Sequence, residues 1–501
     1  MDVLGHLAGG FIAVFTPLNL LVLAVGLVLG LLVAVLPGLT LVMGVVLALP
    51  FTYTMDVTPA IILLTAMYVT GTYGGAFTAI LFRVPGEPID VPLLWDGYTM
   101  ARRGEPARAL GWTLFAALFG GLLAAVVMVA ASEPVARLAL ALSSPDYFAI
   151  IVFGLTSVVS LGGGSVANAL ISLCLGLMFA SVGIDETYGA ERFTFGIPIL
   201  SDGIEYLLVM VGAYGIGEVY TRLAQGYGTA TLSGVGNLGT RLPRLAEVLG
   251  LKATLARSSI LGILIGIVPG AGATIASFVA YGAEGQYGRR RAELGSGIPE
   301  GIVAPQTAAT SSVGGAMIPL LTMGIPGSGA TAIILGAFLL HGVQPGPQVF
   351  VDSPDMVYAI FASLFVAVLG MCVVGYAAIK LLVRVLELPE AIVSAFVVVF
   401  CFIGAFAARN NLTDLYVITA FGVLGFLFER YRFPIAPMVL GSILGPLAET
   451  TFITSMISYA NDWTVFCTRP VAGSVMALSL AALVFPLLRH LRARRRIAAR
   501  S

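Results

Sequence analysis

Gly30-Leu31-Leu32-Val33-Ala34-Val35-Leu36-Pro37-Gly38 recurs in register as Gly262-Ile263-Leu264-Ile265-Gly266-Ile267-Val268-Pro269-Gly270. A Pro-Gly pair inside an apolar segment breaks a helix, because proline lacks a backbone donor and glycine permits sharp turns. A second break follows each copy: Gly74-Gly75-Ala76 runs to Pro85-Gly86, and Gly314-Gly315-Ala316 runs, with one inserted residue, to Pro326-Gly327. Broken helices at matching positions of two halves are a strong sequence pointer to the substrate site of a secondary transporter.

The composition is that of a membrane protein. The 501 residues are 58% hydrophobic and 10% charged, whereas soluble chains carry about 25% charged residues. Apolar stretches long enough to span a bilayer begin near Phe11, Leu110, Tyr147, Tyr206, Val357, Ala391, Leu412 and Ser474. Together with the broken segments they predict roughly 10–12 crossings. We therefore expect an all-α polytopic membrane protein with two related halves and re-entrant hairpins; the number of crossings leaves open whether the halves are inverted.

The chain divides into four predicted segments: a first repeat half at 1–225, a polar connector with an interfacial helix at 226–256, a second half at 257–388, and a C-terminal membrane bundle at 389–501. The N-terminal apolar run reads as a retained span rather than a signal peptide, since it has no basic start. The basic tail from Arg489 to Arg496 predicts a cytoplasmic C-terminus. The first 82 residues hold no Lys or Arg, so this rule leaves the side of the N-terminus open.

Several function classes lack their motifs. The sequence has no phosphate loop, and its lysines are Lys252 and Lys380. It also has no metalloprotease or nucleophile-elbow motif, and its four cysteines have no metal-ligand spacing. We expect no enzymatic activity and no cofactor, and a Na⁺ or H⁺ gradient as the energy source.

The breaks themselves offer binding groups. Unwound backbone inside a bilayer is tolerated only where it is buried in protein or lines a cavity. Freed amides and helix N-termini suit a carboxylate, and freed carbonyls suit Na⁺. The expected substrate-binding residues are Pro37, Gly38, Thr40, Pro269, Gly270, Gly272, Thr274, Gln306, Thr307, Thr310, Pro326, Gly327 and Ser328. The expected coupling-ion residues are Gly86, Glu87, Ser311, Gly329 and Thr331.

Other polar and aromatic residues have simpler interpretations. Ser and Thr in the 306–312 run also suit hydrogen bonds between helices. His341 is interpreted as the end of a span. We expect an interfacial aromatic belt formed by Tyr68, Tyr73, Trp95, Tyr98 and Trp112.

Motifs between residues 25 and 350 resemble those of the large membrane subunit of tripartite tricarboxylate transporters. They include Leu36-Pro37-Gly38-Leu39, Tyr73-Gly74-Gly75-Ala76, Val84-Pro85-Gly86-Glu87, Asp96-Gly97-Tyr98, Arg192-Phe193-Thr194-Phe195-Gly196, Val268-Pro269-Gly270-Ala271-Gly272 and Gly324-Ile325-Pro326-Gly327-Ser328. The resemblance implies a symporter for citrate or another carboxylate in the bacterial inner membrane, with helical hairpins and elevator-type motion. It also implies a small four-span membrane subunit and an extracytoplasmic solute-binding protein as partners.

The chain departs from the family at Ala304-Pro305-Gln306-Thr307-Ala308-Ala309-Thr310. The family usually has glutamate at the place of Gln306 and two asparagines at the places of Ala309 and Thr310. This removes a candidate cation ligand. The alternatives are a stand-alone cation-coupled carrier for another solute, an ion channel with a glycine-rich filter and, last, a membrane-embedded enzyme.

Overall fold

The computed structural model describes residues 3–36, 39–83, 85–161, 165–185, 189–225, 241–385, 390–409 and 411–498. In these ranges the chain is helical apart from turns and one two-stranded antiparallel pair, so the expected all-α polytopic membrane fold is confirmed. It forms two compact units. Unit 1 is Met1–Ala139 with Gly226–Ala408, and unit 2 is Leu140–Gln225 with Arg409–Ser501. These two units do not test the division of the sequence into four segments, which stays a prediction.

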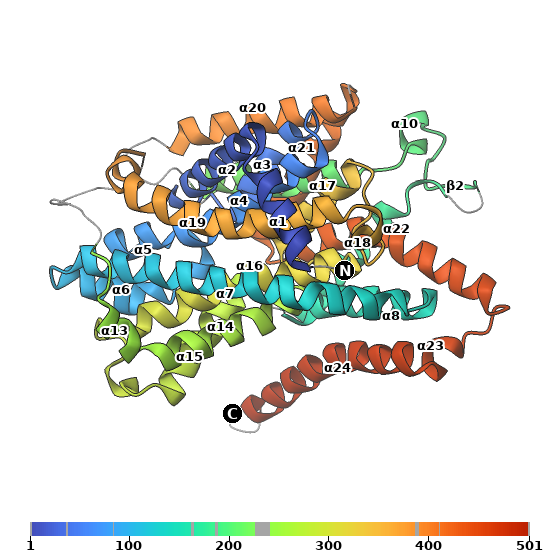
Figure 1. The fold of residues 1–501 in the computed structure, drawn as a ribbon. Coiled ribbons are helices and arrows are strands. Elements are labelled where there is room, and N and C mark those ends of the chain that lie inside the picture. The colour runs from blue at the N-terminus through green and yellow to red at the C-terminus, as the bar shows by residue number, and fades with distance from the viewer. Residues whose placement is uncertain are drawn as a thin grey trace. The chain divides into compact units, whose positions relative to one another are not determined.

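The elements of unit 1 carry both Pro-Gly repeats (Figure 1). They are α1 (Val3–Val14), α2 (Pro17–Val35), α3 (Leu41–Thr52), α4 (Val57–Gly74), α5 (Ala76–Phe82), η1 (Pro88–Asp90), α6 (Leu93–Arg102), α7 (Pro106–Leu140), α13 (Leu245–Gly250), α14 (Lys252–Ile267), α15 (Gly272–Tyr287), η3 (Arg291–Glu293), α16 (Glu300–Met323), α17 (Gly329–Leu340), α18 (Val349–Asp352), α19 (Pro354–Val385) and α20 (Glu390–Arg409). The first part of the predicted connector, 226–240, lies outside the described residues.

Unit 2 holds the strand pair. Its elements are α8 (Ser144–Leu161), α9 (Val166–Ala180), β1 (Gly183–Ile184), β2 (Glu191–Arg192), α10 (Pro198–Ser201), α11 (Tyr206–Met210), the π-helical turn η2 (Val211–Ile216), α12 (Gly217–Gln225), α21 (Thr413–Arg430), α22 (Ile435–Ser458), α23 (Val465–Thr468) and α24 (Pro470–Ala498).

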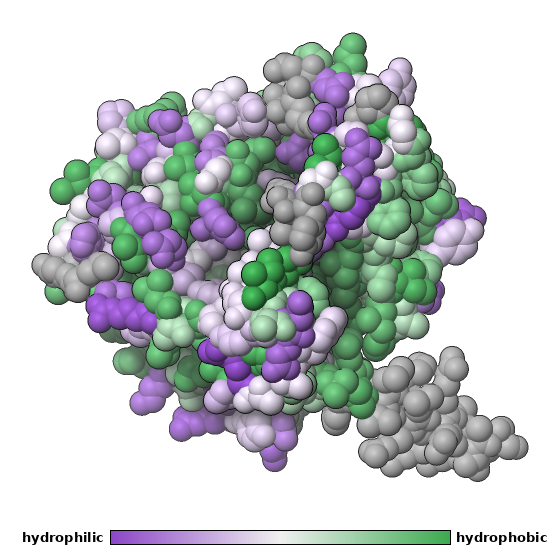
Figure 2. All heavy atoms as spheres, turned by 90° about the vertical axis from the view of Figure 1, so that its right-hand side faces the viewer, coloured by the Kyte–Doolittle hydropathy of each residue, from purple (hydrophilic) through white to green (hydrophobic). Residues whose placement is uncertain are grey.

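Five helical segments in the described ranges are long and apolar enough to cross a membrane: Pro17–Val35, Val57–Phe82, Pro106–Leu140, Pro354–Ala378 and Ile435–Ser458. Shorter apolar helices of 10–17 residues accompany them, among them α3 and α17. Many large apolar side chains are exposed, and Figure 2 shows a broad hydrophobic area along the right-hand part of one side of the chain. Such surface is the expected lipid contact of a polytopic protein.

Small residues bring the first two long helices of each half together. A Cβ atom on Gly30 of α2 would lie 2.3 Å from the Thr70 hydroxyl of α4. A Cβ atom on Gly262 of α14 would lie 2.1 Å from the Ser311 hydroxyl of α16. The same small-residue contact therefore recurs in both halves, as expected for closely packed membrane helices.

The contacts also correct the alignment of the second breaks. A Cβ atom on Gly86 would lie 2.5 Å from the Gly75 Cα atom, and one on Gly327 would lie 2.9 Å from the Ala316 Cα atom. Gly75 therefore matches Ala316, and both stand 11 residues before the glycine of their Pro-Gly pair. The expected insertion in the second copy is wrong, because the packing aligns Gly74 with Gly315.

The two halves run in opposite directions. A Cβ atom on Gly97 would meet both Ile80 of α5 and Ile302 of α16, so those two residues lie at one level. One turn further along α16, Gln306 bonds to the carbonyl of Thr72, which precedes Ile80. In the direction in which residue numbers rise along α16, they fall along α5 and α4, so α16 runs antiparallel to them. The question that the sequence left open is answered: the halves are inverted repeats, the arrangement of many secondary transporters.

Asp96 of α6 joins the first half to the second. Its fully buried carboxylate accepts hydrogen bonds from the backbone N–H groups of Gly295 (2.9 Å), Gly297 (2.8 Å) and Ile298 (3.0 Å). The Tyr281 hydroxyl of α15 donates a fourth, at 2.9 Å. One carboxylate thereby satisfies the amides that lead into α16.

We expect Asp96→Ala to lower the free energy of unfolding by about 3–5 kcal/mol, because each buried donor left unpaired costs about 1–3 kcal/mol. Thermal unfolding in detergent measures the loss. Asp355→Ala is the control: this aspartate is exposed in the first turn of α19, so its loss costs less than about 1 kcal/mol. Equal changes in the two variants would contradict the anchoring role of Asp96.

Candidate functional site

The helix breaks of the two halves meet inside unit 1. The Tyr68 hydroxyl of α4 lies 3.0 Å from the Ser328 hydroxyl at the start of α17. The Gly270 N–H donates to the Gly327 carbonyl at 3.1 Å, and a Cβ atom on Gly329 would lie 3.1 Å from Val42 of α3. Backbone breaks far apart in the sequence are thus adjacent, which is the placement required of a single binding site. Pro37 and Gly38 lie outside the described residues.

In the first half, the chain supplies its own carboxyl group to a helix N-terminus. The Thr40 hydroxyl accepts a hydrogen bond from Met43 N–H at 3.1 Å and so caps α3. The Glu87 carboxylate, which follows the Pro85-Gly86 break, accepts a hydrogen bond from Leu41 N–H in the first turn of α3. A carboxylate is favoured there because the first amides of a helix lack partners and carry partial positive charge.

Ser328 stands at the corresponding place in the second half. Glu87 and Ser328 each follow a Pro-Gly pair directly and each forms a capping box, Glu87 with Asp90 and Ser328 with Thr331. Ser328 N–H donates to the Thr331 hydroxyl at 2.8 Å, and Thr331 N–H donates to the Ser328 hydroxyl at 3.2 Å. The box is retained, but a neutral hydroxyl has replaced the carboxylate.

The N-terminus of α15 is consequently left without an acid. In the part of the chain that the structure describes, no side chain caps its first turn. Gly270 and Gly272 have positive φ values of 78° and 60°, which glycine adopts readily. A Cβ atom on Gly272 would lie only 3.5 Å from Ser328, and residues 272–275 are partly exposed. The amides of this turn correspond to those in the first turn of α3, where Leu41 N–H donates to Glu87.

The polar run of α16 is buried and mostly bonded. The Gln306 side chain donates to the Thr72 carbonyl and to the Thr310 hydroxyl, both at 3.1 Å. Ser311 donates to the Ser259 carbonyl of α14 at 3.3 Å. The Thr307 hydroxyl has no partner among the described residues. Gln306 and Ser311 therefore join helices in this state, and Thr310 bonds to Gln306 within α16. The contacts of all three with substrate or cation remain predictions.

Gln306→Glu is expected to make uptake depend on pH or on Na⁺. A carboxylate cannot donate to the Thr72 carbonyl, so a proton or a cation must stand between the two oxygens. Uptake measured between pH 6 and 8, in Na⁺ and in choline buffers, tests this against the parent. Gln306→Met, which removes the donor without adding charge, is the control; an unchanged profile in Gln306→Glu would remove this residue from the site.

The structure adds Tyr68 to the candidate site, whereas the sequence analysis assigned it to the interfacial aromatic belt. Tyr68, Tyr73 and Trp112 are each 1% exposed, so their assignment to an interfacial belt is wrong. They face protein neighbours because α4 and the start of α7 are surrounded by other helices. An aromatic residue on an apolar helix carries no local sign of which surface it faces. Trp95, at 41% exposed, remains compatible with a belt.

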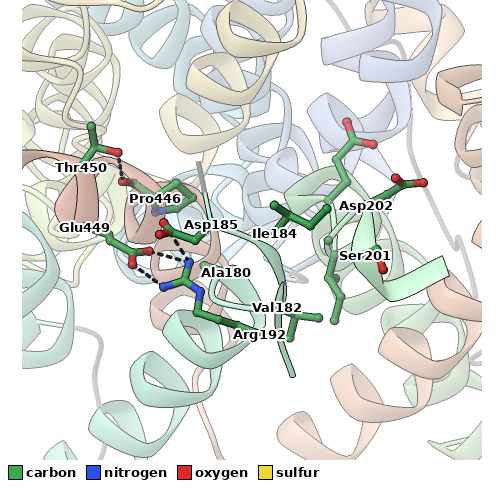
Figure 3. Close-up of a pocket in the computed structure, with 13 residues that line it drawn as sticks. Ala180, Val182, Ile184, Asp185, Arg192, Ser201, Asp202, Pro446, Glu449 and Thr450 are labelled. Atoms are coloured by element: carbon green, nitrogen blue, oxygen red, sulfur yellow. Dashed lines mark hydrogen bonds and ion pairs between the residues drawn. The ribbon is translucent and has the colours of Figure 1, made fainter. Parts of the chain in front are cut away.

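Unit 2 contains a separate acidic cavity of about 310 Å³. Figure 3 shows the Arg192 guanidinium between Asp185 and Glu449; it bonds to Glu449 and lies 3.7 Å from Asp185. The hydrogen bond to Glu449 raises the pKa of Arg192 above its ordinary value. The cavity's arginine is thus already paired, and none of the expected site residues lines it.

No group of three or more His, Cys, Asp or Glu side chains in the described ranges is arranged to hold a metal ion. The coupling-ion residues expected from the sequence stay a prediction.

Comparisons with known proteins identify relatives along nearly the whole chain. The family described as tripartite tricarboxylate transporter TctA matches residues 20–440. A curated Agrobacterium vitis protein, an uncharacterized 52.8 kDa protein in the TAR-I ttuC' 3' region, is 37% identical over 496 residues, 99% of this chain and 98% of its own length. An uncharacterized protein in the TAR-II ttuC' 3' region of the same organism is 37% identical over 234 residues, 47% of this chain and 97% of its own length. No solved structure gives a significant match.

Proposed function

Because the chain belongs to the tripartite tricarboxylate transporter TctA family, we propose that it is the membrane subunit through which a di- or tricarboxylate enters the cell, driven by a cation gradient. Membership makes it a multi-pass transport protein of a multi-component system. The substrate, the coupling ion and the route are the proposal.

One observation carries the proposal: the N-termini of α3 and α15, which correspond to each other in the two halves, meet different groups. On α3 the amide of Leu41 meets the carboxylate of Glu87. On α15 the corresponding first turn meets Ser328, and no acid of the described chain occupies it. An external carboxylate bound there would complete the pattern that Glu87 forms internally.

In this mechanism the first substrate carboxylate accepts hydrogen bonds from the first amides of α15 and from the hydroxyls of Ser328 and Tyr68. Gly270, Gly272 and Thr274 border the same turn, and Pro269, Pro326 and Gly327 shape it. The neutral groups bind the anion without a buried cation, whose desolvation would be costly. Thr307, Gln306 and Thr310 on α16 are proposed to meet a further carboxylate when the breaks move.

The coupling cation is proposed to use the other side of the breaks. Carbonyl oxygens near Gly86 and Gly329, with hydroxyls of Thr331 and Ser311, provide hard oxygen ligands, and Glu87 directly follows Gly86 in the sequence. Cation binding there would lower the repulsion between Glu87 and an incoming carboxylate. This coupling links the substrate to the gradient.

The system would include a small four-span membrane subunit and an extracytoplasmic solute-binding protein in a bacterial inner membrane, with the basic C-terminal tail in the cytoplasm. The binding protein would deliver substrate and this chain would carry it across.

Uptake of labelled di- and tricarboxylates by vesicles tests the proposal. The vesicles contain this protein and its small subunit, with or without the binding protein, under imposed Na⁺ or H⁺ gradients and without ATP. Saturable uptake that needs the binding protein and one gradient is expected. Equal uptake with and without the binding protein would favour a stand-alone carrier, and non-saturable flux would favour a channel. If correctly inserted protein takes up none of the carboxylates, the carboxylate assignment is overturned.

A further inference from the structure

A second cavity, of about 620 Å³, lies in unit 1, and its lining includes Arg83, two residues before the Pro85-Gly86 break. It is formed by the end of α5, by α6, by α15 and by the loop before α16. Three arginines and three aromatic rings line most of it: Arg83, Arg102, Arg103, Trp95, Tyr98 and Tyr281. None of these residues has a part in the proposed transport site.

None of the three arginines has an acidic partner among the described residues. Several other arginines of unit 1 are paired: Arg108 with Glu105 and Glu247, Arg257 with Glu284, and Arg290 with Glu293 and Glu300. No ion pair of Arg83, Arg102 or Arg103 occurs among the residues that the structure describes.

The one acid of α6, Asp96, forms no ion pair with these arginines. It is buried, and three backbone amides and the Tyr281 hydroxyl use its oxygens; two of these donors, Gly295 and Tyr281, also line the cavity. Three arginines against one acid leave the cavity with a net positive charge, which suits an anionic ligand.

Arg83 is held in place by its backbone. It ends α5 in the left-handed region, with φ 59°, and its N–H donates to the Thr78 carbonyl. Its guanidinium lies 5.6 Å from the centre of the Tyr98 ring, within the range of a cation–π contact. L residues rarely adopt this conformation, so the surrounding fold enforces this position.

The aromatic wall continues into apolar surface. The Trp95 ring lies 4.7 Å from the Tyr281 ring and 6.1 Å from the Phe278 ring. Phe278 and Val279 of α15 are about two-fifths exposed, as is Trp95. A ligand with a charged head and an apolar body matches a cationic cavity that opens beside apolar surface.

We propose that this cavity binds a phosphate group, and that the adjoining apolar surface favours the headgroup of an anionic phospholipid as its source. Arg103 is followed within five residues by Arg108, and Arg241 N–H bonds to the Ala107 carbonyl, so Arg108, Arg241 and Arg244 stand at the same end of unit 1. The positive-inside rule assigns such an end to the cytoplasm. Basic pockets at that interface are suited to anionic lipid headgroups. The bound phosphate holds α6 against α15, next to the Asp96 contacts.

Native mass spectrometry of the full chain in detergent tests the proposal with phosphatidylglycerol, phosphatidylcholine and inorganic phosphate as probes. The test variant is Arg102→Gln/Arg103→Gln, since both side chains are exposed and Arg83 keeps its capping role. The control is Arg289→Gln/Arg291→Gln, which removes the same charge from exposed arginines outside the cavity. Thermal unfolding in phosphatidylcholine verifies that all three proteins are folded.

The parent and the control should retain phosphatidylglycerol over phosphatidylcholine, and the test variant should bind it at least about tenfold more weakly. If inorganic phosphate at millimolar concentration binds with the same dependence on Arg102 and Arg103 while the lipid does not, the phosphate site stands and its source is a free anion. Equal lipid retention by the test variant and the parent, or no binding of either probe to the parent, would overturn the proposal.

Discussion

Ser328→Glu should abolish carboxylate uptake while the protein stays folded and inserted. Glu87 stands at the corresponding position after Pro85-Gly86 and also forms a capping box, so a glutamate is compatible with this type of turn. The new carboxylate would reach the first amides of α15, as Glu87 reaches Leu41, and would occupy the proposed substrate position. Because it is tethered, its effective concentration is in the millimolar range or above, and added substrate cannot readily displace it.

The measurement is initial uptake in vesicles at several substrate concentrations, normalised to the amount of inserted protein. Ser328→Ala is the matched control: it removes the hydroxyl but adds no anion, and we expect a loss of about fivefold to tenfold, the value of one hydrogen bond. Uptake by Ser328→Glu with parental affinity and rate would show that the substrate does not use the α15 N-terminus.

Gly327→Leu should also abolish transport, for a steric reason. A Cβ atom at Gly327 would lie 2.4 Å from the Gly266 carbonyl oxygen and 2.8 Å from the Ala316 Cβ atom. The carbonyl belongs to the α14 backbone and cannot rotate away, so the 324–328 turn must leave its position. This displaces Ser328 and breaks the bond from Gly270 N–H to the Gly327 carbonyl.

Uptake and membrane abundance of Gly327→Leu are to be compared with those of Gly282→Leu. Gly282 lies on the exposed side of α15, and a Cβ atom there meets nothing within 4 Å, so the control should transport normally. Gly86→Leu should fail in the same way as Gly327→Leu, because its Cβ atom would lie 2.6 Å from the Ala34 carbonyl oxygen. Normal uptake by Gly327→Leu would rule out this turn as part of the transport site.

Local features of the fold could be predicted from the sequence because they depend on local chemistry. An apolar composition with few charges requires helices that satisfy their own backbone in lipid. Pro-Gly pairs end helices wherever they stand: α14 ends at Ile267, just before Pro269-Gly270, and α16 ends at Met323, just before Pro326-Gly327. The same reasoning located Ser328 and Glu87 beside breaks, although it assigned them different ligands.

The rest depended on contacts between distant segments. Whether Gly74 matches Gly314 or Gly315 is decided by which residue the Pro-Gly turn packs against. The hydrogen bond between the hydroxyls of Tyr68 and Ser328, which are 260 residues apart, could be recognised only once α4 and α17 were placed side by side. The direction of the second half likewise follows from the pairing of Gln306 with Thr72.

By itself, then, the sequence determined a polytopic helical membrane protein with two related halves, each broken at Pro-Gly. Only the tertiary structure decided that the halves are inverted, that their breaks meet, and that an internal carboxylate occupies one helix N-terminus but not its counterpart. The physical reason is that a helix break depends on the backbone of a few neighbouring residues, whereas an occupied or open N-terminus depends on which distant side chain folds against it.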